Sequence, residues 1–160
     1  MARNEIVVEA PPEAVFDVLA DPRTYGQWVV GSREIRAADE SWPEPGSAFD
    51  HSVGKAPLVI ADDTSVVASR PPVMLELRAR ARPLPTARIT LHLQPYEKGT
   101  RVTMIEDPTS RTLNVVGGPL LHAVIRVRNR ESLSRLKALA EGTAPRPSGV
   151  LPARQRPHAV

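Results

Sequence analysis

Between residues 33 and 107 the sequence consists of short segments of alternating apolar and polar residues. Each connection between them contains proline or glycine, at residues 42–46, 55–57, 70–72, 83–85 and 97–99. This pattern predicts strands near residues 33–39, 47–54, 58–69, 73–82, 86–95 and 100–107. Because no helical segment intervenes, we expect consecutive strands to pair in an antiparallel meander.

The alternation also assigns the two faces of the predicted sheet. In residues 75–82 the odd positions are apolar and the even positions are charged. The next strand follows the same rule, with Leu91 on the apolar face and His92 on the polar one. We therefore expect one buried and one solvated face. Four arginines would lie together on the solvated face, which we interpret as ordinary surface rather than as a binding surface: Arg78, Arg80, Arg82 and Arg88.

Helices are predicted on both sides of the meander. After a first strand at Glu5–Glu9, prolines with nearby acidic residues indicate two short helices, one beginning near residue 11 and one from Asp21 to Trp28. A long helix is predicted from Pro119 to about Glu141, with a glycine after its end. Its 23 or so residues would span roughly 34 Å, enough to cross a whole sheet.

Length and composition restrict the class of protein. A chain of 160 residues fits one domain, and it contains no cysteine, which excludes disulfides, thiolate metal sites and a cysteine nucleophile. The first residues form no apolar signal-peptide segment, and no apolar run reaches the ~20 residues of a membrane helix. We therefore expect a cytoplasmic protein without stable membrane insertion.

The formal net charge of +3 comes from the C-terminal segment. Residues 143–160 contain three arginines and no acidic residue, which leaves 18 basic residues to balance 18 acidic ones in the rest of the chain. A neutral body argues against a nucleic-acid partner. We expect a ligand-binding domain at residues 1–142 and a disordered, basic, proline-rich tail at residues 143–160.

The order of elements and several short motifs resemble the START-like, helix-grip superfamily, and within it the polyketide cyclase/dehydrase-like (SRPBCC) proteins. The motifs lie at residues 8–16, 19–22, 28, 99–104 and 128–137. The resemblance covers residues 1 to about 142. It implies an α+β helix-grip fold: a curved antiparallel sheet of about seven strands wrapped on the long C-terminal helix, two short helices between strands 1 and 2, and a cavity between sheet and helix. Members of the superfamily include aromatic polyketide cyclases, lipid carriers and plant hormone receptors.

Strand parity places two polar residues on the apolar face. Glu106 shares its parity with Met104, and His51 shares its parity with Phe49. Such buried groups need a partner and often mark functional sites. The alternative for Glu106 is a position beyond the sheet edge, in water.

Six further residues are candidates for the cavity wall. His122 and Asn129 lie on the flank of the apolar face of the long helix, seven residues apart, although each could instead have a purely structural role. Trp28 follows the second short helix, where it is either wall or core. The inward-facing apolar candidates are Leu77, Leu91 and Met104.

Three functions are compatible with these residues. The first is the binding or carrying of a small hydrophobic molecule, such as a polyketide, lipid or aromatic metabolite, in a pocket with one or two polar anchors. The second is a cyclase, aromatase or dehydratase that uses Glu106 as base with His51 or His122 as proton donor. The third is a protein-interaction module with an unknown partner, acting through the arginines or the tail. We expect no cofactor and no metal, since the four histidines lack ligand spacing.

Overall fold

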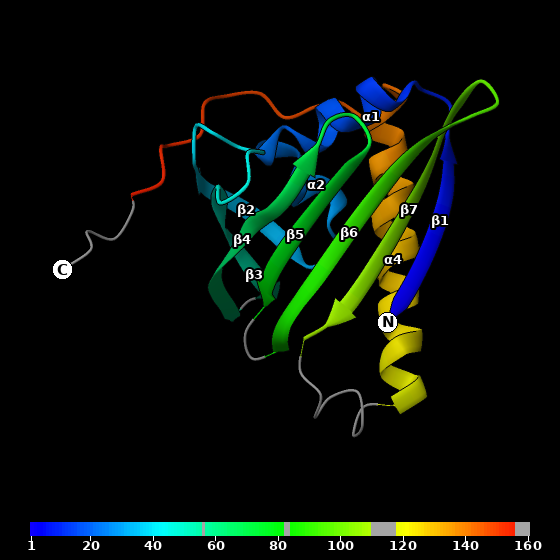
Figure 1. Cartoon of the computed structure of the whole chain (residues 1–160). Coiled ribbons are helices and arrows are strands. Elements are labelled where there is room, and N and C mark those ends of the chain that lie inside the picture. The colour runs from blue at the N-terminus through cyan, green and yellow to red at the C-terminus, as the bar shows by residue number, and fades with distance from the viewer. Residues whose placement is uncertain (56, 82–83, 110–117, 156–160) are drawn as a thin grey trace.

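The computed structural model describes residues 1–55, 57–81, 84–109 and 118–155, and in it a curved sheet wraps around a long helix (Figure 1). The strands are β1 (Ala2–Val8), β2 (Ser32–Ala38), β3 (Ala48–Lys55), β4 (Leu58–Arg70), β5 (Met74–Ala81), β6 (Leu84–Tyr96) and β7 (Gly99–Pro108). The helices are α1 (Pro12–Leu19), the 3₁₀ helix η1 (Pro22–Thr24), α2 (Tyr25–Trp28) and α4 (Gly118–Ala140).

The sheet has seven strands in the order β1-β7-β6-β5-β4-β3-β2, and every neighbouring pair is antiparallel. Strands β2 to β7 form the predicted meander, and β1 joins its far edge beside β7. The first strand begins at Ala2 rather than at Glu5 because Ala2 pairs with Glu106 at the end of β7. The predicted helix-grip fold is confirmed.

The local signals for the helices act as predicted. Pro12 occupies the first turn of α1, and the Asp21 side chain accepts a hydrogen bond from the backbone N–H of Arg23 at 3.0 Å, at the start of η1. Gly142, just after α4, has a φ of +74°, the left-handed conformation that glycine adopts without strain. These signals determine where α1 and η1 begin and where α4 ends.

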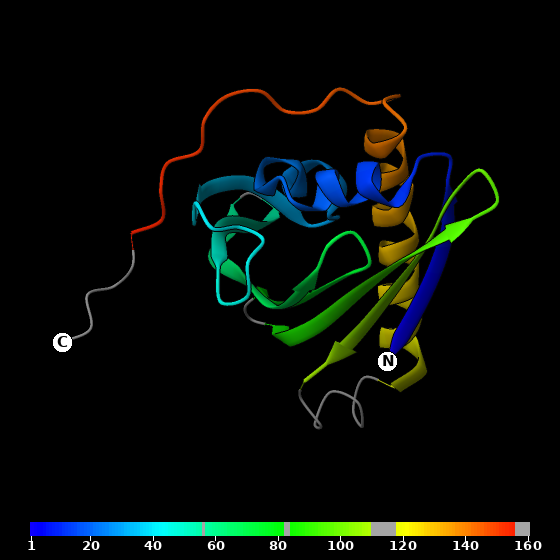
Figure 2. The ribbon, with the colours of Figure 1, turned by 45° about the horizontal axis from the view of Figure 1, so that its top comes forward.

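The core lies between the inner face of the sheet and α4 (Figure 2). Leu133, Leu136 and Leu139 of α4 are almost fully buried in one cluster with inward-facing strand residues such as Leu93 and Val102. The short helices α1 and α2 add buried residues at one end of this core. None of the described helices is long and apolar enough to cross a membrane.

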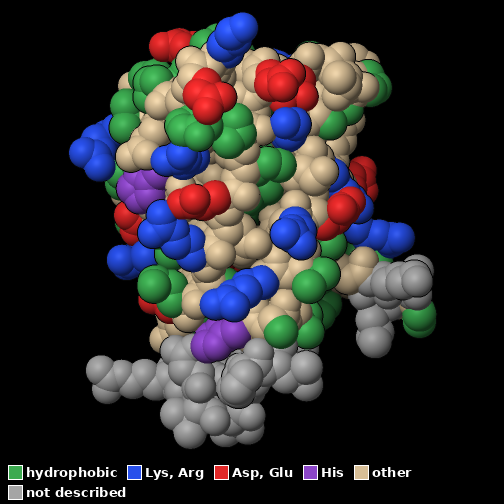
Figure 3. All heavy atoms as spheres, turned by 90° about the vertical axis from the view of Figure 1, so that its right-hand side faces the viewer, with side chains coloured by type: hydrophobic (Ala, Val, Ile, Leu, Met, Phe, Trp, Pro, Cys, Tyr) green, Lys and Arg blue, Asp and Glu red, His purple; other side chains and the backbone are tan. Residues whose placement is uncertain are grey.

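The predicted outer face is charged but mixed in sign. Arg78, Arg80 and Arg88 are exposed, as predicted from parity, while Arg82 lies outside the described residues. Arg80 Nη1 lies 3.5 Å from an oxygen of Asp63, and Arg88 Nε lies 3.3 Å from an oxygen of Glu76. Basic and acidic side chains also alternate on the face that carries β1 and α4 (Figure 3). These ion pairs favour the interpretation of the arginines as ordinary solvated surface and argue against a basic binding patch.

Residues 143–155, which belong to the segment predicted as a disordered tail, contact β2 and β3. Ala153 forms a parallel bridge with Ala38 of β2, and Arg154 Nε donates a 2.9 Å hydrogen bond to an oxygen of Asp50. Figures 1 and 2 show this segment crossing from the end of α4 toward β2. These contacts use the free edge of β2 and a carboxylate of β3, which composition alone does not report.

Candidate functional site

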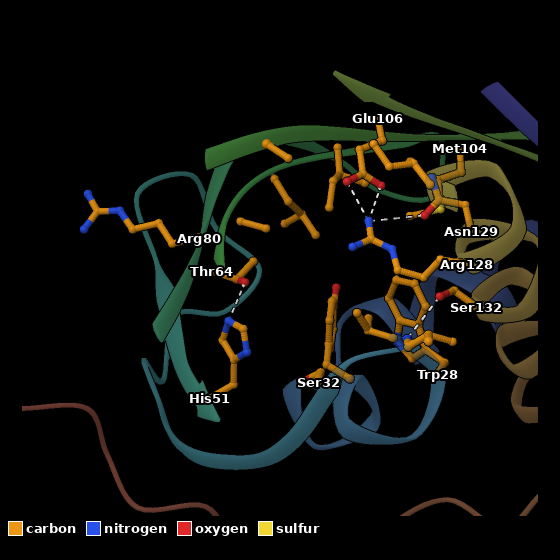
Figure 4. Close-up of a pocket in the computed structure, with 18 of the residues that line it drawn as sticks. Trp28, Ser32, His51, Thr64, Arg80, Met104, Glu106, Arg128, Asn129 and Ser132 are labelled. Carbon is orange, nitrogen blue, oxygen red and sulfur yellow. Dashed lines mark hydrogen bonds and ion pairs between the residues drawn. The ribbon is translucent and has the colours of Figure 1, made fainter. Parts of the chain in front are cut away.

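A cavity of about 150 Å³ lies between the inner face of the sheet, α2 and α4 (Figure 4). Its wall includes residues from all strands from β2 to β7. Most of the wall is apolar, with side chains such as Phe49, Leu77, Ile89 and Met104. The expected space between sheet and helix is therefore present and is not filled by side chains.

The cavity arises where inward-facing side chains become smaller along two paired strands. Strands β5 and β6 align Leu75 with Leu91, then Leu77 with Ile89, and finally Ala79 with Ala87. Leu75 and Leu91 are fully buried in the core, whereas the two alanines line the cavity. The missing side-chain volume at the alanine pair leaves room that the helices do not fill.

An ion pair between Glu106 and Arg128 forms the most polar part of the wall. Glu106, on β7, is buried, and Arg128, on α4, is half-buried. Arg128 Nη2 donates hydrogen bonds to both carboxylate oxygens of Glu106, at 2.6 and 2.5 Å. The same nitrogen lies 3.5 Å from Asn129 Oδ1. The carboxylate that parity predicted to be buried thus has the partner that its burial requires.

Four residues of α4 at helical spacing line the cavity: Ile125, Arg128, Asn129 and Ser132. Ser132 Oγ accepts a 3.1 Å hydrogen bond from the backbone N–H of Val30, which holds the segment after α2 against α4. Sequence reasoning missed Arg128 and Ser132 as site residues. The spacing i, i+3, i+4, i+7 starting from Ile125 is a signal that could have found both.

His51 lies in the wall on β3 and is buried. Its Nε2 is 3.1 Å from Thr64 Oγ1 on β4, and its Nδ1 has no hydrogen-bond partner among the described residues. Burial lowers the pKa of the His51 imidazole, against the opposing effect of the Asp62 carboxylate. The folded protein therefore favours the neutral imidazole.

Trp28 contributes to both the wall and the core. Its ring packs on Tyr25 at a centroid distance of 5.0 Å, and Tyr25 in turn packs on Phe49 at 4.7 Å. These contacts fix the indole at the end of α2, against the cavity. Its Nε1 has no hydrogen-bond partner within the described part of the chain.

The structure brings six of the eight predicted ligand-binding residues to the cavity wall: Trp28, His51, Leu77, Met104, Glu106 and Asn129. Leu91 lies on the predicted inner face but in the core. His122 lies outside the wall, with Nε2 3.3 Å from the N-terminal amine. Within the described ranges, no group of three or more His, Asp or Glu side chains could hold a metal ion.

The sequence matches, over residues 2–141, the family described as polyketide cyclase / dehydrase and lipid transport. The chain belongs to this family. Family membership agrees with the resemblance of the motifs and with the cavity between sheet and helix. Among curated proteins, none matches the chain significantly.

Several solved structures have the same fold and a low sequence identity to this chain. Protein CV1439 from Chromobacterium violaceum has a TM-score of 0.68 and 20% identity, over 87% of this chain and 96% of that one. The di-domain ARO/CYC StfQ from the steffimycin biosynthetic pathway has a TM-score of 0.65 and 14% identity, over 88% of this chain and 50% of StfQ. DynU16, described as a putative protein in the dynemicin biosynthetic locus, has a TM-score of 0.64 and 19% identity, over 88% of this chain and 47% of DynU16.

The ion pair generates a prediction for stability. Arg128→Met should lower the free energy of unfolding by about 3 kcal/mol, because it leaves the buried Glu106 carboxylate without its charged partner. Arg135→Met is the matched control, since it removes an exposed i,i+4 pair with Glu131 and should cost less than about 0.5 kcal/mol. Urea denaturation measures both values, and equal losses in the two variants would contradict the role given to the pair.

The lowered pKa of His51 generates a prediction for pH dependence. Below the ordinary value of 6.5 the unfolded chain binds a proton at residue 51 more readily than the folded protein does. The contribution of His51 to stability is thus complete above this value and is lost as the pH falls toward the lowered pKa. His51→Gln should reduce the loss of stability between about pH 7.5 and 5.5. Urea denaturation at both pH values tests this, and an unchanged loss in His51→Gln would refute it.

Proposed function

We propose that the chain binds or carries a small, largely apolar molecule in the cavity between its sheet and α4. The observation that carries this proposal is the mainly apolar wall around an unfilled volume of about 150 Å³. Ligand sites are typically concave, lined by apolar and aromatic side chains, and supplied with a few polar groups that orient the ligand. The wall has these features, with Trp28 as its aromatic part and Glu106–Arg128 as its charged part.

The volume favours one of the ligand classes expected from the sequence. A cavity of about 150 Å³ holds a molecule of about the size of one benzene ring. This favours a single-ring aromatic metabolite over a multi-ring polyketide or a long-chain lipid. The polar groups exceed the one or two anchors expected, because the wall also contains His51 and Asn129.

The state of Glu106 favours binding over catalysis. A general base must reach the proton that it removes from the substrate. Both Glu106 oxygens already accept hydrogen bonds from Arg128, so base catalysis would require this pair to separate. His122 lies outside the cavity wall, which argues against a role for it in the proposed acid/base set.

A cyclase, aromatase or dehydratase is the second candidate, favoured by the unpartnered Nδ1 of His51 in the wall. StfQ is described as an ARO/CYC, which gives this chemistry a precedent on the fold. In this case Glu106 would act as base and His51, in its protonated form, as proton donor, from opposite sides of the cavity (Figure 4). The lowered pKa of His51 disfavours that protonated form.

The enzymatic candidate predicts that His51→Gln lowers kcat about 100-fold or more, because proton transfer would lose its donor. The measured quantity is the turnover of a short polyketone thioester, monitored through the appearance of the aromatic product. His92→Gln, on the outer face of the sheet, should retain full activity. Full turnover by His51→Gln would exclude the proposed acid/base set.

Ligand binding predicts a large effect of filling the cavity. Ala79→Phe should weaken the binding of a one-ring aromatic probe at least about tenfold, because the new ring occupies the volume left by the Ala79–Ala87 pair. Val73→Phe places the same aromatic ring at an exposed position in the turn before β5 and should leave binding unchanged. Native mass spectrometry and ligand-observed NMR measure occupancy, with circular dichroism as the check on folding. Undiminished binding to folded Ala79→Phe would place the ligand elsewhere.

A further inference from the structure

Arg128 has donor groups that its hydrogen bonds to the described residues do not use. Its hydrogen bonds to Glu106 and its contact with Asn129 all involve one nitrogen, Nη2. In Figure 4 the other terminal nitrogen of the guanidinium points into the space between the sheet and α2. An oxygen atom of a ligand in the cavity could accept a hydrogen bond from this nitrogen.

Two further N–H donors in the wall lack partners within the described residues. Asn129 is 1% exposed, and because its Oδ1 faces Arg128, its Nδ2 is the unpartnered donor. Trp28 Nε1, also buried, is the second. A buried donor without an acceptor is unfavourable, so this part of the wall is complementary to a ligand that supplies acceptor oxygens.

The charge of the wall restricts which acceptor oxygen fits. Glu106 already neutralises Arg128, and the imidazole of His51 is neutral in the folded protein because burial lowers its pKa. Arg80 also lines the cavity, but its guanidinium points outward in Figure 4, toward its ion pair with Asp63. A ligand carboxylate would therefore bring an uncompensated negative charge close to Glu106, whereas a carbonyl oxygen brings none.

We infer that the cavity selects apolar ligands with a neutral carbonyl oxygen over carboxylates of the same size, and that Glu106 determines this selectivity. Arg128 and Asn129 donate to the carbonyl, and Glu106 prevents Arg128 from acting as a receptor for anions. Replacing Glu106 with glutamine frees the positive charge and should make the cavity a carboxylate site. This inference rests on the proposed ligand-binding function.

The test compares acetophenone with benzoate, which have nearly the same shape and differ in charge. Ligand-observed NMR gives the Kd of both probes. The experiment is done at about pH 7.5, which is well above the ordinary pKa range of a carboxyl group, so that benzoate is charged. Wild-type protein should bind acetophenone at least about tenfold more tightly than benzoate, the ratio expected for one charge-assisted interaction. Glu106→Gln should reverse this preference.

Two controls isolate the charge of Glu106. Asp107→Asn makes the same carboxylate-to-amide change at the next residue of β7, whose side chain is outside the cavity wall and exposed, and it should retain the wild-type preference. The double variant Glu106→Gln/Arg128→Gln lacks both charges and should not gain affinity for benzoate. Circular dichroism confirms that each variant is folded.

The outcomes separate this inference from the function on which it rests. If wild-type protein binds benzoate as tightly as acetophenone, the cavity binds ligands but the selectivity is refuted, even if the variants do not fold. If folded Glu106→Gln still prefers acetophenone, Glu106 is not the determinant. If neither probe binds the wild-type protein at millimolar concentration, the proposed one-ring ligand site is overturned, and the inference with it.

Discussion

The inner face of the sheet is apolar along its strands, and such a face must be covered by other elements to leave water. The chain offers α4 and two helices of eight and four residues for this purpose. Helix α4 packs along β1, and α1 covers one end of the inner face beside it. The remaining inner surface, toward Ala79 and Ala87, faces α2 and the polar side of α4 across a gap. The cavity is therefore a consequence of how little helix is available to cover a strongly curved sheet.

The polar groups of the site depend on this same geometry. Glu106 lies on the inner face near the end of β7, and α4 supplies Arg128 as its charged partner. A single helical face thus serves two purposes, since Leu133 and Leu136 fill the core and Arg128 and Asn129, one to two turns earlier, line the cavity. The change from leucine to arginine and asparagine along this face marks the boundary between structural core and site.

The sequence predicts the order of elements and the faces of the strands because both follow from short-range patterns. Parity with a period of two placed His51 and Glu106 on the inner face, and the structure agrees for both. Parity tells which face of the sheet a residue lies on, but not at which position along the strand the cavity begins. For this reason the sequence predicts Leu91 in the cavity wall, whereas it lies in the core. The partnership of Glu106 with Arg128 joins a strand to a helix 22 residues later, and no local pattern reports such a contact. His122 illustrates the same limit, since its position depends on where α4 begins relative to β1.

Unpartnered buried atoms give an independent argument for the location of the site. A buried polar atom without a hydrogen bond costs about 1–3 kcal/mol, so a folded protein has few of them unless a ligand or water supplies the partner. Within the described residues, such atoms occur on Asn4, outside the cavity, and on four side chains of the cavity wall: Trp28, Ser32, His51 and Asn129. These four come from α2, β2, β3 and α4 and face one space of about 150 Å³.

Imperfect packing in a structural core gives no reason for unpartnered polar atoms of four elements to lie around the same space. A site that binds a polar group of a ligand, as proposed above, gives such a reason. The apolar wall agrees with the proposed ligand site, and these atoms favour a proposed occupant that carries polar groups as well as hydrocarbon.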